Sequence, residues 1–386
     1  MDEQMGLQDG LVVVDRTDVI DVIIVGAGAA GIGMGLVLQA LGMDNFKLIE
    51  RDQIGASFRR WPREMRFISP SFNGNPFGLM DLNSIALQTS PAFTLDAEHP
   101  SGEQYAAYLQ GVAKHWELPV ETGIALNALT REGDEFRLHT STGTLRSRFV
   151  IWAGGEFQFP RTTPFPGADL CLHNSLIETW TGMKGKEFVV IGGYESAIDA
   201  AINLAQLGKH VRVLDGEGKW DYDDPDPSIA LSPYTKGRLR KALQTGLVEL
   251  IKDARVSRVE KHSKRWALQT EAGDWIETNS QPILATGFYS SAHQTPDLWE
   301  FRDDGMPLLT GHDESTRTPG LFLVGPSVRQ GTHIFCFIYK FRQRFAVVAN
   351  QIAQRLNIDT APLEDYRRNN MFLDDLSCCG EGCAKC

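Results

Sequence analysis

Cysteine is nearly absent from the body of this sequence. Of six cysteines in 386 residues, Cys171 and Cys336 stand alone and the other four fall within the last nine residues. This distribution excludes a small domain stapled by disulfides. The crowding near the C-terminal end needs a separate explanation, and it comprises Cys378, Cys379, Cys383 and Cys386.

Runs of positive charge are also lacking. The chain has 38 basic and 49 acidic residues, and its formal net charge is −11 at pH 7. Such a surface repels phosphate backbones and anionic lipid, so we expect no nucleic-acid partner and no membrane partner. With 42% hydrophobic and 23% charged residues the chain is globular, and its length predicts two or three packed units.

A basic segment followed by an apolar one is missing from residues 1–21, which predicts a cytoplasmic protein without a secretory signal. Residues 22–43 form a charge-free run of 22 residues that is long enough to cross a bilayer. The run contains six glycines, which weaken a helix. A strand, a turn and a helix explain it better.

The first recognisable unit begins with a β-branched strand at residues 22–25. It continues into Gly26-Ala27-Gly28-Ala29-Ala30-Gly31, a GxGxxG turn that opens an apolar helix. The glycines permit a tight turn, close approach of a pyrophosphate and close packing of helix on strand. A second strand over 46–49 ends in Glu50, whose carboxylate suits ribose hydroxyls, with Arg51 beside it. The pattern predicts a dinucleotide site.

The same design recurs downstream as an internal repeat. A strand over 188–191 leads into Gly192-Gly193-Tyr194-Glu195-Ser196-Ala197, then a helix, then a strand over 210–214 that ends in Asp215. Gly192 follows Gly26 by 166 residues and Asp215 follows Glu50 by 165. Tyr194 replaces the middle glycine, so the ligand path over this turn differs. We predict a second nucleotide site.

Two further predicted strands end in small residues, and each is the last strand of one of the two units. They are residues 150–155, which include Gly154, and residues 282–287, which include Thr286 and Gly287. Residues 136–140 alternate as in an antiparallel strand, and residues 321–325 form a buried strand that ends at Gly325. A long helix is expected over about 334–356.

This arrangement resembles the two-dinucleotide-binding-domain flavoproteins, the superfamily of thioredoxin reductases and flavin-containing monooxygenases. The local resemblance to the bacillithiol-disulfide-reductase-like branch lies in residues 61–71, 192–197 and 226–229. The resemblance implies an α/β fold with two Rossmann-like dinucleotide-binding domains, the nicotinamide domain being inserted in a discontinuous FAD domain. The expected boundaries are 18–162 and 289–357 for FAD, 163–288 for NAD(P), and 358–386 for a flexible cysteine-rich tail.

The resemblance also assigns cofactor sites. FAD is expected in the first unit, with NADH or NADPH in the second, and Gly154, Thr286, Gly287 and Gly325 closing the two sites. Trp61 would wall the flavin pocket or pack in the core. Asp215 favours the free 2′-hydroxyl of NADH, although Arg212 and Lys219 keep NADPH open.

Three departures from the family patterns limit the functional assignment. No CxxC precedes Cys383, so the dithiol mechanism of thioredoxin reductases is excluded. Ala30 stands where the bacillithiol-type branch has a cysteine. The monooxygenase signature is only partly matched around residues 165–173, where Cys171 occupies the histidine position. What remains is hydride transfer from a nicotinamide to FAD, with the acceptor open.

The main hypothesis is a sulfur-based or metal-thiolate acceptor, a small molecule or a small protein, reached through Cys378, Cys379, Cys383 and Cys386. Two glycines lie among these cysteines, and Lys385 beside Cys386 favours its thiolate. Metal capture by the thiolates and a passive tail are the alternatives, and no resident metal site is predicted. The alternative activity is a flavin-dependent monooxygenase, and a redox-sensing flavoprotein is the reading without catalysis. Cys336 and His173 are expected to be structural, and a homodimer stays open.

Overall fold

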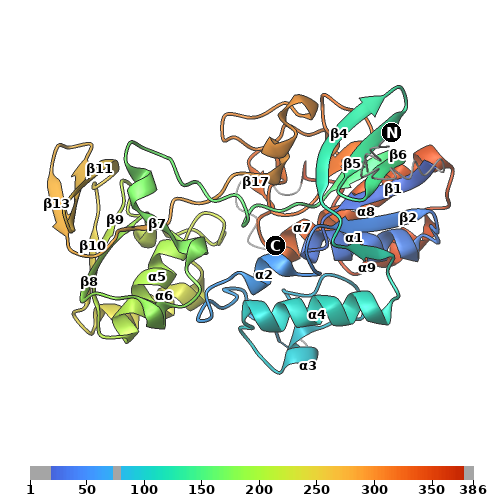
Figure 1. Ribbon diagram of the computed structural model, residues 1–386. Coiled ribbons are helices and arrows are strands. Elements are labelled where there is room, and N and C mark those ends of the chain that lie inside the picture. The colour runs from blue at the N-terminus through green and yellow to red at the C-terminus, as the bar shows by residue number, and fades with distance from the viewer. Residues whose placement is uncertain (1–18, 73–79, 378–386) are drawn as a thin grey trace, which may run out of the picture.

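The computed structural model describes residues 19–72 and 80–377. Figure 1 shows two sheet-centred parts side by side, with helices α2, α3 and α4 below the first of them. The first part contains the N-terminal strand β1 (Val19–Val25), whose residues 22–24 are completely buried. Such a β-branched run fits the centre of a parallel sheet, which is covered on both faces.

The first sheet has the strand order β3-β2-β1-β6-β5-β4, and β15 pairs with β6 outside that path. Strands β3, β2, β1, β6 and β15 run parallel, whereas β4, β5 and β6 form an antiparallel excursion. The bounds are β2 (Phe46–Glu50), β3 (Val120–Thr122), β4 (Leu126–Glu132), β5 (Glu135–Thr140), β6 (Gly143–Trp152) and β15 (Leu321–Leu323). The late strand β15 therefore returns to the first sheet.

Helices cover the first sheet and surround its core. Helix α1 packs against α8, and a Cβ at Gly33 would collide with the ring of Phe345, so these helices meet at a glycine. The helices of this part are α1 (Ala29–Ala40), α2 (Ala56–Arg59), α3 (Pro91–Leu95), α4 (Gly102–His115), α7 (Ile338–Phe341), α8 (Phe345–Leu356) and α9 (Glu364–Arg368).

The second part is a parallel sheet of order β10-β9-β8-β14-β7, with an antiparallel sheet β11-β12-β13 beside it. Its elements are β7 (Leu172–His173), β8 (Glu187–Ile191), α5 (Glu195–Gln206), β9 (His210–Leu214), α6 (Pro233–Leu243), β10 (Val248–Ile251), β11 (Val256–His262), β12 (Arg265–Thr270), β13 (Trp275–Thr278) and β14 (Ile283–Leu284). The predicted strand, turn and helix of each unit are confirmed.

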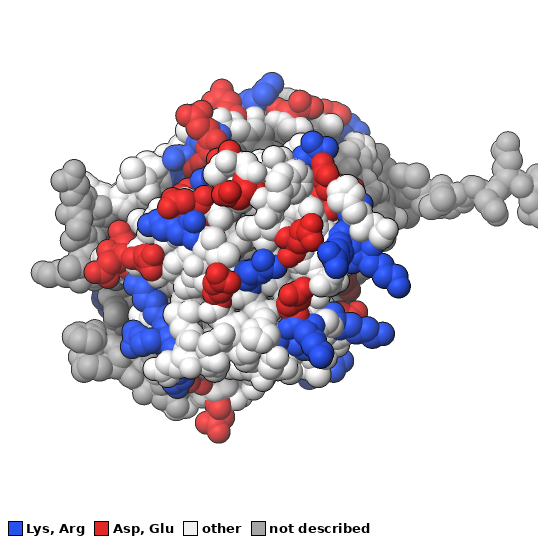
Figure 2. All heavy atoms as spheres, turned by 90° about the vertical axis from the view of Figure 1, so that its left-hand side faces the viewer, with Lys and Arg blue, Asp and Glu red and all other residues white. Residues whose placement is uncertain are grey.

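The end of the molecule that carries β11–β13 has both signs of charge interleaved (Figure 2). Ion pairs join Arg258 to Glu260 at 2.8 Å and Arg265 to Glu277 at 3.4 Å. Exposed pairs of this kind contribute little to stability.

Polar side chains hold the two parts together. Glu64, from the loop after α2, accepts hydrogen bonds from the Thr179 hydroxyl at 2.5 Å and the Trp180 amide at 3.2 Å. On the other side, the Lys340 ammonium donates to the Ser228 hydroxyl at 2.8 Å. These contacts position the second glycine turn relative to the first.

Two expectations about the C-terminal region were wrong. The helix expected over 334–356 begins only at Ile338, because His333 and Ile334 form β17, which pairs with β16 (Arg329–Gln330), and a 3₁₀ turn separates α7 from α8. Residues 358–377 are not a flexible tail: Met371 is completely buried and Tyr366 nearly so. The four clustered cysteines lie outside the described residues.

Candidate functional site

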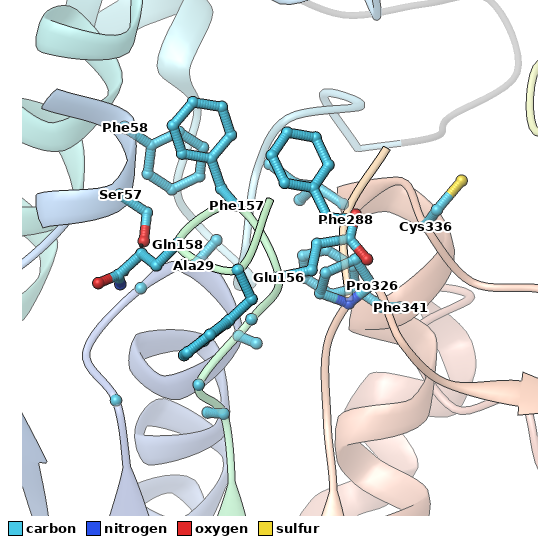
Figure 3. A pocket seen from close by; sticks show the side chains of 18 of the residues that line it. Ala29, Ser57, Phe58, Glu156, Phe157, Gln158, Phe288, Pro326, Cys336 and Phe341 are labelled. Carbon is cyan, nitrogen blue, oxygen red and sulfur yellow. Dashed lines mark hydrogen bonds between the residues drawn. The ribbon is translucent and has the colours of Figure 1, made fainter. Parts of the chain in front are cut away.

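A cavity of about 670 Å³ lies between the two parts and is lined by both. This volume is within the usual range for small-molecule and cofactor sites. Residues of the first glycine turn, the ends of β2 and β6, the second glycine turn and the start of α7 all contribute to its wall. In Figure 3 the side chains of Phe157, Phe288, Pro326 and Phe341 surround a space into which Glu156 also projects.

The first glycine turn has the geometry that a pyrophosphate needs. Gly26 has φ +106°, and a Cβ there would lie 2.6 Å from the Ala153 carbonyl oxygen. A Cβ at Gly31 would collide with the Gly26 carbonyl oxygen, whereas a Cβ at Gly28 would meet nothing within 4 Å. The backbone at Gly28 is thus open to the cavity at the N-terminus of α1, where backbone amides and the helix dipole favour anions. The turn fits the diphosphate of FAD.

The acid at the end of β2 is fixed beside this turn. The Glu50 carboxylate accepts hydrogen bonds from the Ala27 amide at 2.9 Å and the Asp52 amide at 3.0 Å. Glu50 and Arg51 both line the cavity, and the Arg51 guanidinium donates to the Gln158 side chain. Carboxylate oxygens oriented in this way can accept further hydrogen bonds from ribose hydroxyls.

The second glycine turn repeats only part of this geometry. Gly192 has φ +119°, and a Cβ there would collide with the Ala285 carbonyl oxygen, as at Gly26. At the middle position the Tyr194 hydroxyl donates to the carbonyl oxygens of Pro227 and Ala230. Tyr194, Glu195 and Ser196 line the cavity. The start of α5 therefore faces the same space as the first turn.

The two acids of the second unit are engaged by protein groups. The Glu195 carboxylate accepts hydrogen bonds from the Ser232 amide and the Thr235 hydroxyl, both at 2.5 Å, and burial raises its pKa. The Asp215 carboxylate accepts from the Gly218 amide at 2.7 Å and lies against Gly193, where a Cβ would be 2.5 Å from its carboxyl carbon. Arg212 instead points to the Glu277 carbonyl oxygen at 2.6 Å.

The structure brings many of the predicted cofactor residues to the cavity wall. Those that line it are Gly26, Gly28, Ala29, Ala30, Glu50, Arg51, Trp61, Gly154, Glu195, Ser196 and Gly287. Those that do not are Gly31, Gly192, Gly193, Ala197, Asp215, Thr286 and Gly325. Of the latter, Gly31 and Gly192 shape the turns, and Thr286 donates its hydroxyl to the Arg161 carbonyl oxygen at 3.1 Å.

Several lining residues were missed by the sequence analysis. They are Glu156, Phe157, Gln158, Asp199, Phe288, Pro326 and Phe341. Glu156 and Phe157 follow Gly155, and Phe288 follows Gly287, so the small-residue turns at the strand ends were the available signal.

The two cysteines of the described chain are free thiols. Burial raises the pKa of Cys171 to about 12, and it also raises the pKa of Cys336, whose thiol donates to the Ser228 hydroxyl at 3.2 Å. His173 is buried and its Nδ1 lies 2.9 Å from the Ser175 hydroxyl, as expected for a structural residue. Within residues 19–72 and 80–377, no three His, Cys, Asp or Glu side chains form a metal site, and no helix is long and apolar enough to cross a membrane.

Comparison with known proteins decides the family. Residues 23–325 match the family described as pyridine nucleotide-disulphide oxidoreductase. The chain belongs to this family. It is therefore an FAD- and NAD(P)H-dependent oxidoreductase, and the α/β fold with Rossmann-like units is confirmed.

Individual members of the superfamily are similar over nearly their whole length. Bacilliredoxin reductase Bdr of Bacillus subtilis is 23% identical over 339 residues, which cover 87% of this chain and 98% of that protein. The structure of bacillithiol disulfide reductase Bdr of Staphylococcus aureus superposes with TM-score 0.72 at 20% identity and covers 87% of this chain and 98% of that one. A flavin-containing monooxygenase of Stenotrophomonas maltophilia gives 0.67 at 18% identity, covering 88% and 100%. The latter two similarities concern the fold.

Proposed function

We propose that this oxidoreductase passes electrons from NAD(P)H through FAD to a sulfur-based acceptor, either a disulfide or a metal-thiolate, and that the C-terminal cysteines relay them. The observation that carries the proposal is that both glycine turns face one cavity that contains no cysteine pair among the described residues. Electrons can therefore enter at the flavin, but the thiols that would pass them on must lie elsewhere.

The entry of electrons follows from the shared cavity. FAD bound along Gly26–Gly31 supplies the chemistry of accepting a hydride, and the second turn positions the nicotinamide dinucleotide. Gly28 gives the diphosphate access to backbone amides, Glu50 orients the ribose, and Ser196 lies in the first turn of α5, the helix that faces the second diphosphate. Phe157, Phe288 and Phe341 give an apolar wall to the place where the two rings would meet.

The choice of a sulfur acceptor rests on the relatives and on the described thiols. The relative from Bacillus subtilis is named a reductase of bacilliredoxin, and the similar structure from Staphylococcus aureus a reductase of bacillithiol disulfide. In this chain Ala30 stands at the start of α1 and cannot form a disulfide. Cys336 holds its proton, because burial raises its pKa, and a protonated thiol is a poor nucleophile. The remaining candidates are Cys378, Cys379, Cys383 and Cys386.

The proposed domain division follows the same logic. The FAD domain comprises 18–162 and 289–357, and the nicotinamide domain comprises 163–288. In support, β1 and β15 belong to the first sheet, whereas β7 to β14 belong to the others.

Truncation after Ser377 tests the relay. We expect the truncated protein to retain FAD and to be reduced anaerobically by NAD(P)H at the rate of the full chain. Its NAD(P)H consumption with a small disulfide such as cystine should fall by about 100-fold, the scale of losing a catalytic nucleophile. A full-length variant with the four cysteines changed to serine separates loss of thiols from loss of length. Unchanged disulfide turnover in both variants would refute the relay.

Metal content distinguishes the two sulfur-based acceptors. Protein purified under reducing conditions should contain less than about 0.1 equivalents of copper, zinc or iron if the cysteines act only as a redox relay, because bound metal would block them. Stoichiometric metal that is lost from the four-serine variant would favour a metal-thiolate acceptor instead.

The second candidate is a flavin-dependent monooxygenase, which the same absence of a described cysteine pair at the cavity favours. Oxygen consumption coupled to NAD(P)H oxidation separates the two. A reductase releases one hydrogen peroxide for each oxygen consumed. An oxygenase consumes oxygen with little peroxide once a small sulfur- or nitrogen-containing substrate is present.

A further inference from the structure

Glu156 is a carboxyl in the cavity that the proposed electron path does not use. It follows Gly154 and Gly155 in the loop after β6, and the carbonyl of Ala153 at the start of this loop packs against the first glycine turn. In Figure 3 its carboxyl group extends into the space beside Pro326, Phe288 and Phe341. Glu156 therefore faces the region between the FAD turn and the nicotinamide turn.

The other carboxyl groups that line the cavity already have protein partners. Glu50 accepts from the Ala27 amide, Glu195 accepts from Ser232 and Thr235, and Asp199 pairs with Arg238 at 2.6 Å. No side-chain hydrogen bond or ion pair joins Glu156 to any residue of the described chain. Glu156 is partly exposed to the cavity, and a carboxyl that lines a cavity without a protein partner is a candidate functional group.

The surroundings of Glu156 favour its protonated form. Burial raises its pKa, and the positive charge of Arg329 on β16 offsets part of this effect. The Cys336 thiol is the other titratable group that interacts with it electrostatically. A carboxyl whose pKa is raised in this way holds its proton to higher pH than a free glutamate, which suits a general acid.

The chemistry of the family leaves one proton unaccounted for. A hydride from NAD(P)H brings two electrons and one proton to FAD. Reduction of a disulfide to two thiols, or of O₂ to hydrogen peroxide, takes two electrons and two protons. The second proton must come from a group at the flavin or from solvent, and Glu156 lies in the wall of the cavity where the acceptor would meet the flavin.

We propose that Glu156 is the catalytic acid that supplies this second proton to the acceptor. Its O–H bond breaks as the S–S bond of a disulfide accepts two electrons and is cleaved. One S–H bond forms with the Glu156 proton and the other with the proton that the flavin received with the hydride. The reduced flavin is thereby reoxidised to FAD, the disulfide becomes two thiols, and the Glu156 carboxylate is reprotonated from solvent. The proposal rests on the oxidoreductase activity of the family and holds for a disulfide or for O₂.

Cys336 is the competing proton source, and its geometry is less suitable. Its thiol proton is directed to the Ser228 hydroxyl, which also accepts from Lys340 at 2.8 Å. Loss of that proton would leave a buried thiolate, which is unfavourable because burial raises the pKa of this thiol.

The first test is the pH dependence of flavin reoxidation. Holoenzyme reduced anaerobically with one equivalent of NAD(P)H is mixed with O₂ or cystine between pH 5.5 and 9. In the wild type the rate should fall as pH rises through the pKa of Glu156. In Glu156→Gln the reoxidation rate should be about 100-fold lower at low pH and should show no inflection with pH. In Glu156→Asp both the rate and the inflection should be restored. Reduction by NAD(P)H should change by less than about threefold, and Glu249→Gln, an exposed carboxyl of β10, is the matched control.

The second test reads protons without turnover. Anaerobic photoreduction of bound FAD in weakly buffered solution with a pH-indicator dye gives the protons taken up per flavin. The negative charge of the reduced flavin should raise the pKa of Glu156. At pH values where Glu156 is ionised beside oxidised FAD and protonated beside the reduced flavin, the wild type should therefore take up one more proton than Glu156→Gln. An unchanged pH profile and unchanged proton uptake in Glu156→Gln would overturn the proposal. If Glu156→Gln fails to retain FAD, the same measurements on the wild type and on Glu156→Asp test the proposal. A wild-type reoxidation rate that does not change with pH would then overturn it. Loss of the cysteine relay affects cystine only, whereas loss of Glu156 affects both acceptors.

Discussion

The two glycine turns are built alike at their first residue and differently after it. Gly26 and Gly192 both have positive φ, and both approach a carbonyl oxygen at the end of a neighbouring strand too closely for a side chain. At the third position of the motif the first turn requires Gly31, because a Cβ would collide with the Gly26 carbonyl oxygen. The second turn has Ala197 there, completely buried. The first helix thus approaches its turn more closely than the second.

The acids at the ends of β2 and β9 also differ in how closely they are bound to their own glycine turns. Glu50 binds the amide of the first turn itself, whereas Asp215 binds amides of the loop that follows it. The middle residue of the first turn is open to the cavity, and that of the second is a tyrosine tied to a neighbouring loop. A close-fitting turn suits a cofactor that stays bound through turnover, and a looser one suits a dinucleotide that must exchange in every cycle.

The third position should show the largest difference between the turns. We expect Gly31→Ala to destabilise the protein by about 3 kcal/mol and to abolish FAD retention, because backbone at the turn must move to accommodate the methyl group. The matched change Ala197→Gly should cost about 1 kcal/mol and leave the FAD content unchanged. Urea denaturation and the flavin absorbance of the purified proteins measure both effects. Equal losses would mean that the turns are equivalent.

The middle position should affect binding without affecting folding. Gly28 has an extended backbone, with φ −82°, and a Cβ there meets no protein atom, so Gly28→Val should fold normally. The side chain would occupy the path of the diphosphate, and we expect FAD to bind about 100-fold more weakly, a cost of about 2.7 kcal/mol. Fluorescence titration of apoprotein with FAD measures the Kd, and thermal denaturation of the apoprotein is the control. Unchanged affinity would place the diphosphate elsewhere.

The glycine turns and the strands around them could be predicted from sequence because their periodicity and spacing are local. The contents of the cavity between them could not. Glu156 and Phe288 lie in loops with no periodic pattern, and their convergence depends on how the two sheets are placed by contacts such as that of Glu64 with Thr179. The segment around Met371 looked like a polar tail because a few apolar residues anchor it, and such sparse contacts leave no periodic signal.

The acid after the second turn should decide the nicotinamide preference. The Asp215 carboxylate lies against Gly193, where it would repel a 2′-phosphate, and we therefore expect kcat/KM to be higher with NADH. Asp215→Arg should shift the NADPH to NADH ratio of kcat/KM by about tenfold, the effect of one charge-assisted hydrogen bond. Arg212→Ala is the control, because Arg212 is bound to the Glu277 carbonyl oxygen, and it should leave the ratio unchanged. If Asp215→Arg left the NADPH to NADH ratio of kcat/KM unchanged, Asp215 would not be the residue that distinguishes the two cofactors at the ribose.

Helix α5 has an acid, Glu195, in its first turn, whereas helix α1 has none. Burial raises its pKa, so the protonated form is favoured in the folded protein more than in the unfolded chain. This contribution to stability is complete below the ordinary glutamate pKa and is lost as pH rises through the raised value in the folded state. Glu195→Gln has no charged form, and its amide can accept from the Ser232 amide and donate to the Thr235 hydroxyl. We therefore expect the variant to be more stable than the wild type by about 1 kcal/mol at pH 8 and equally stable at pH 4.5. Urea denaturation at the two pH values measures this, and a variant that is less stable at pH 8 would show that the ionised carboxylate is the form the fold requires.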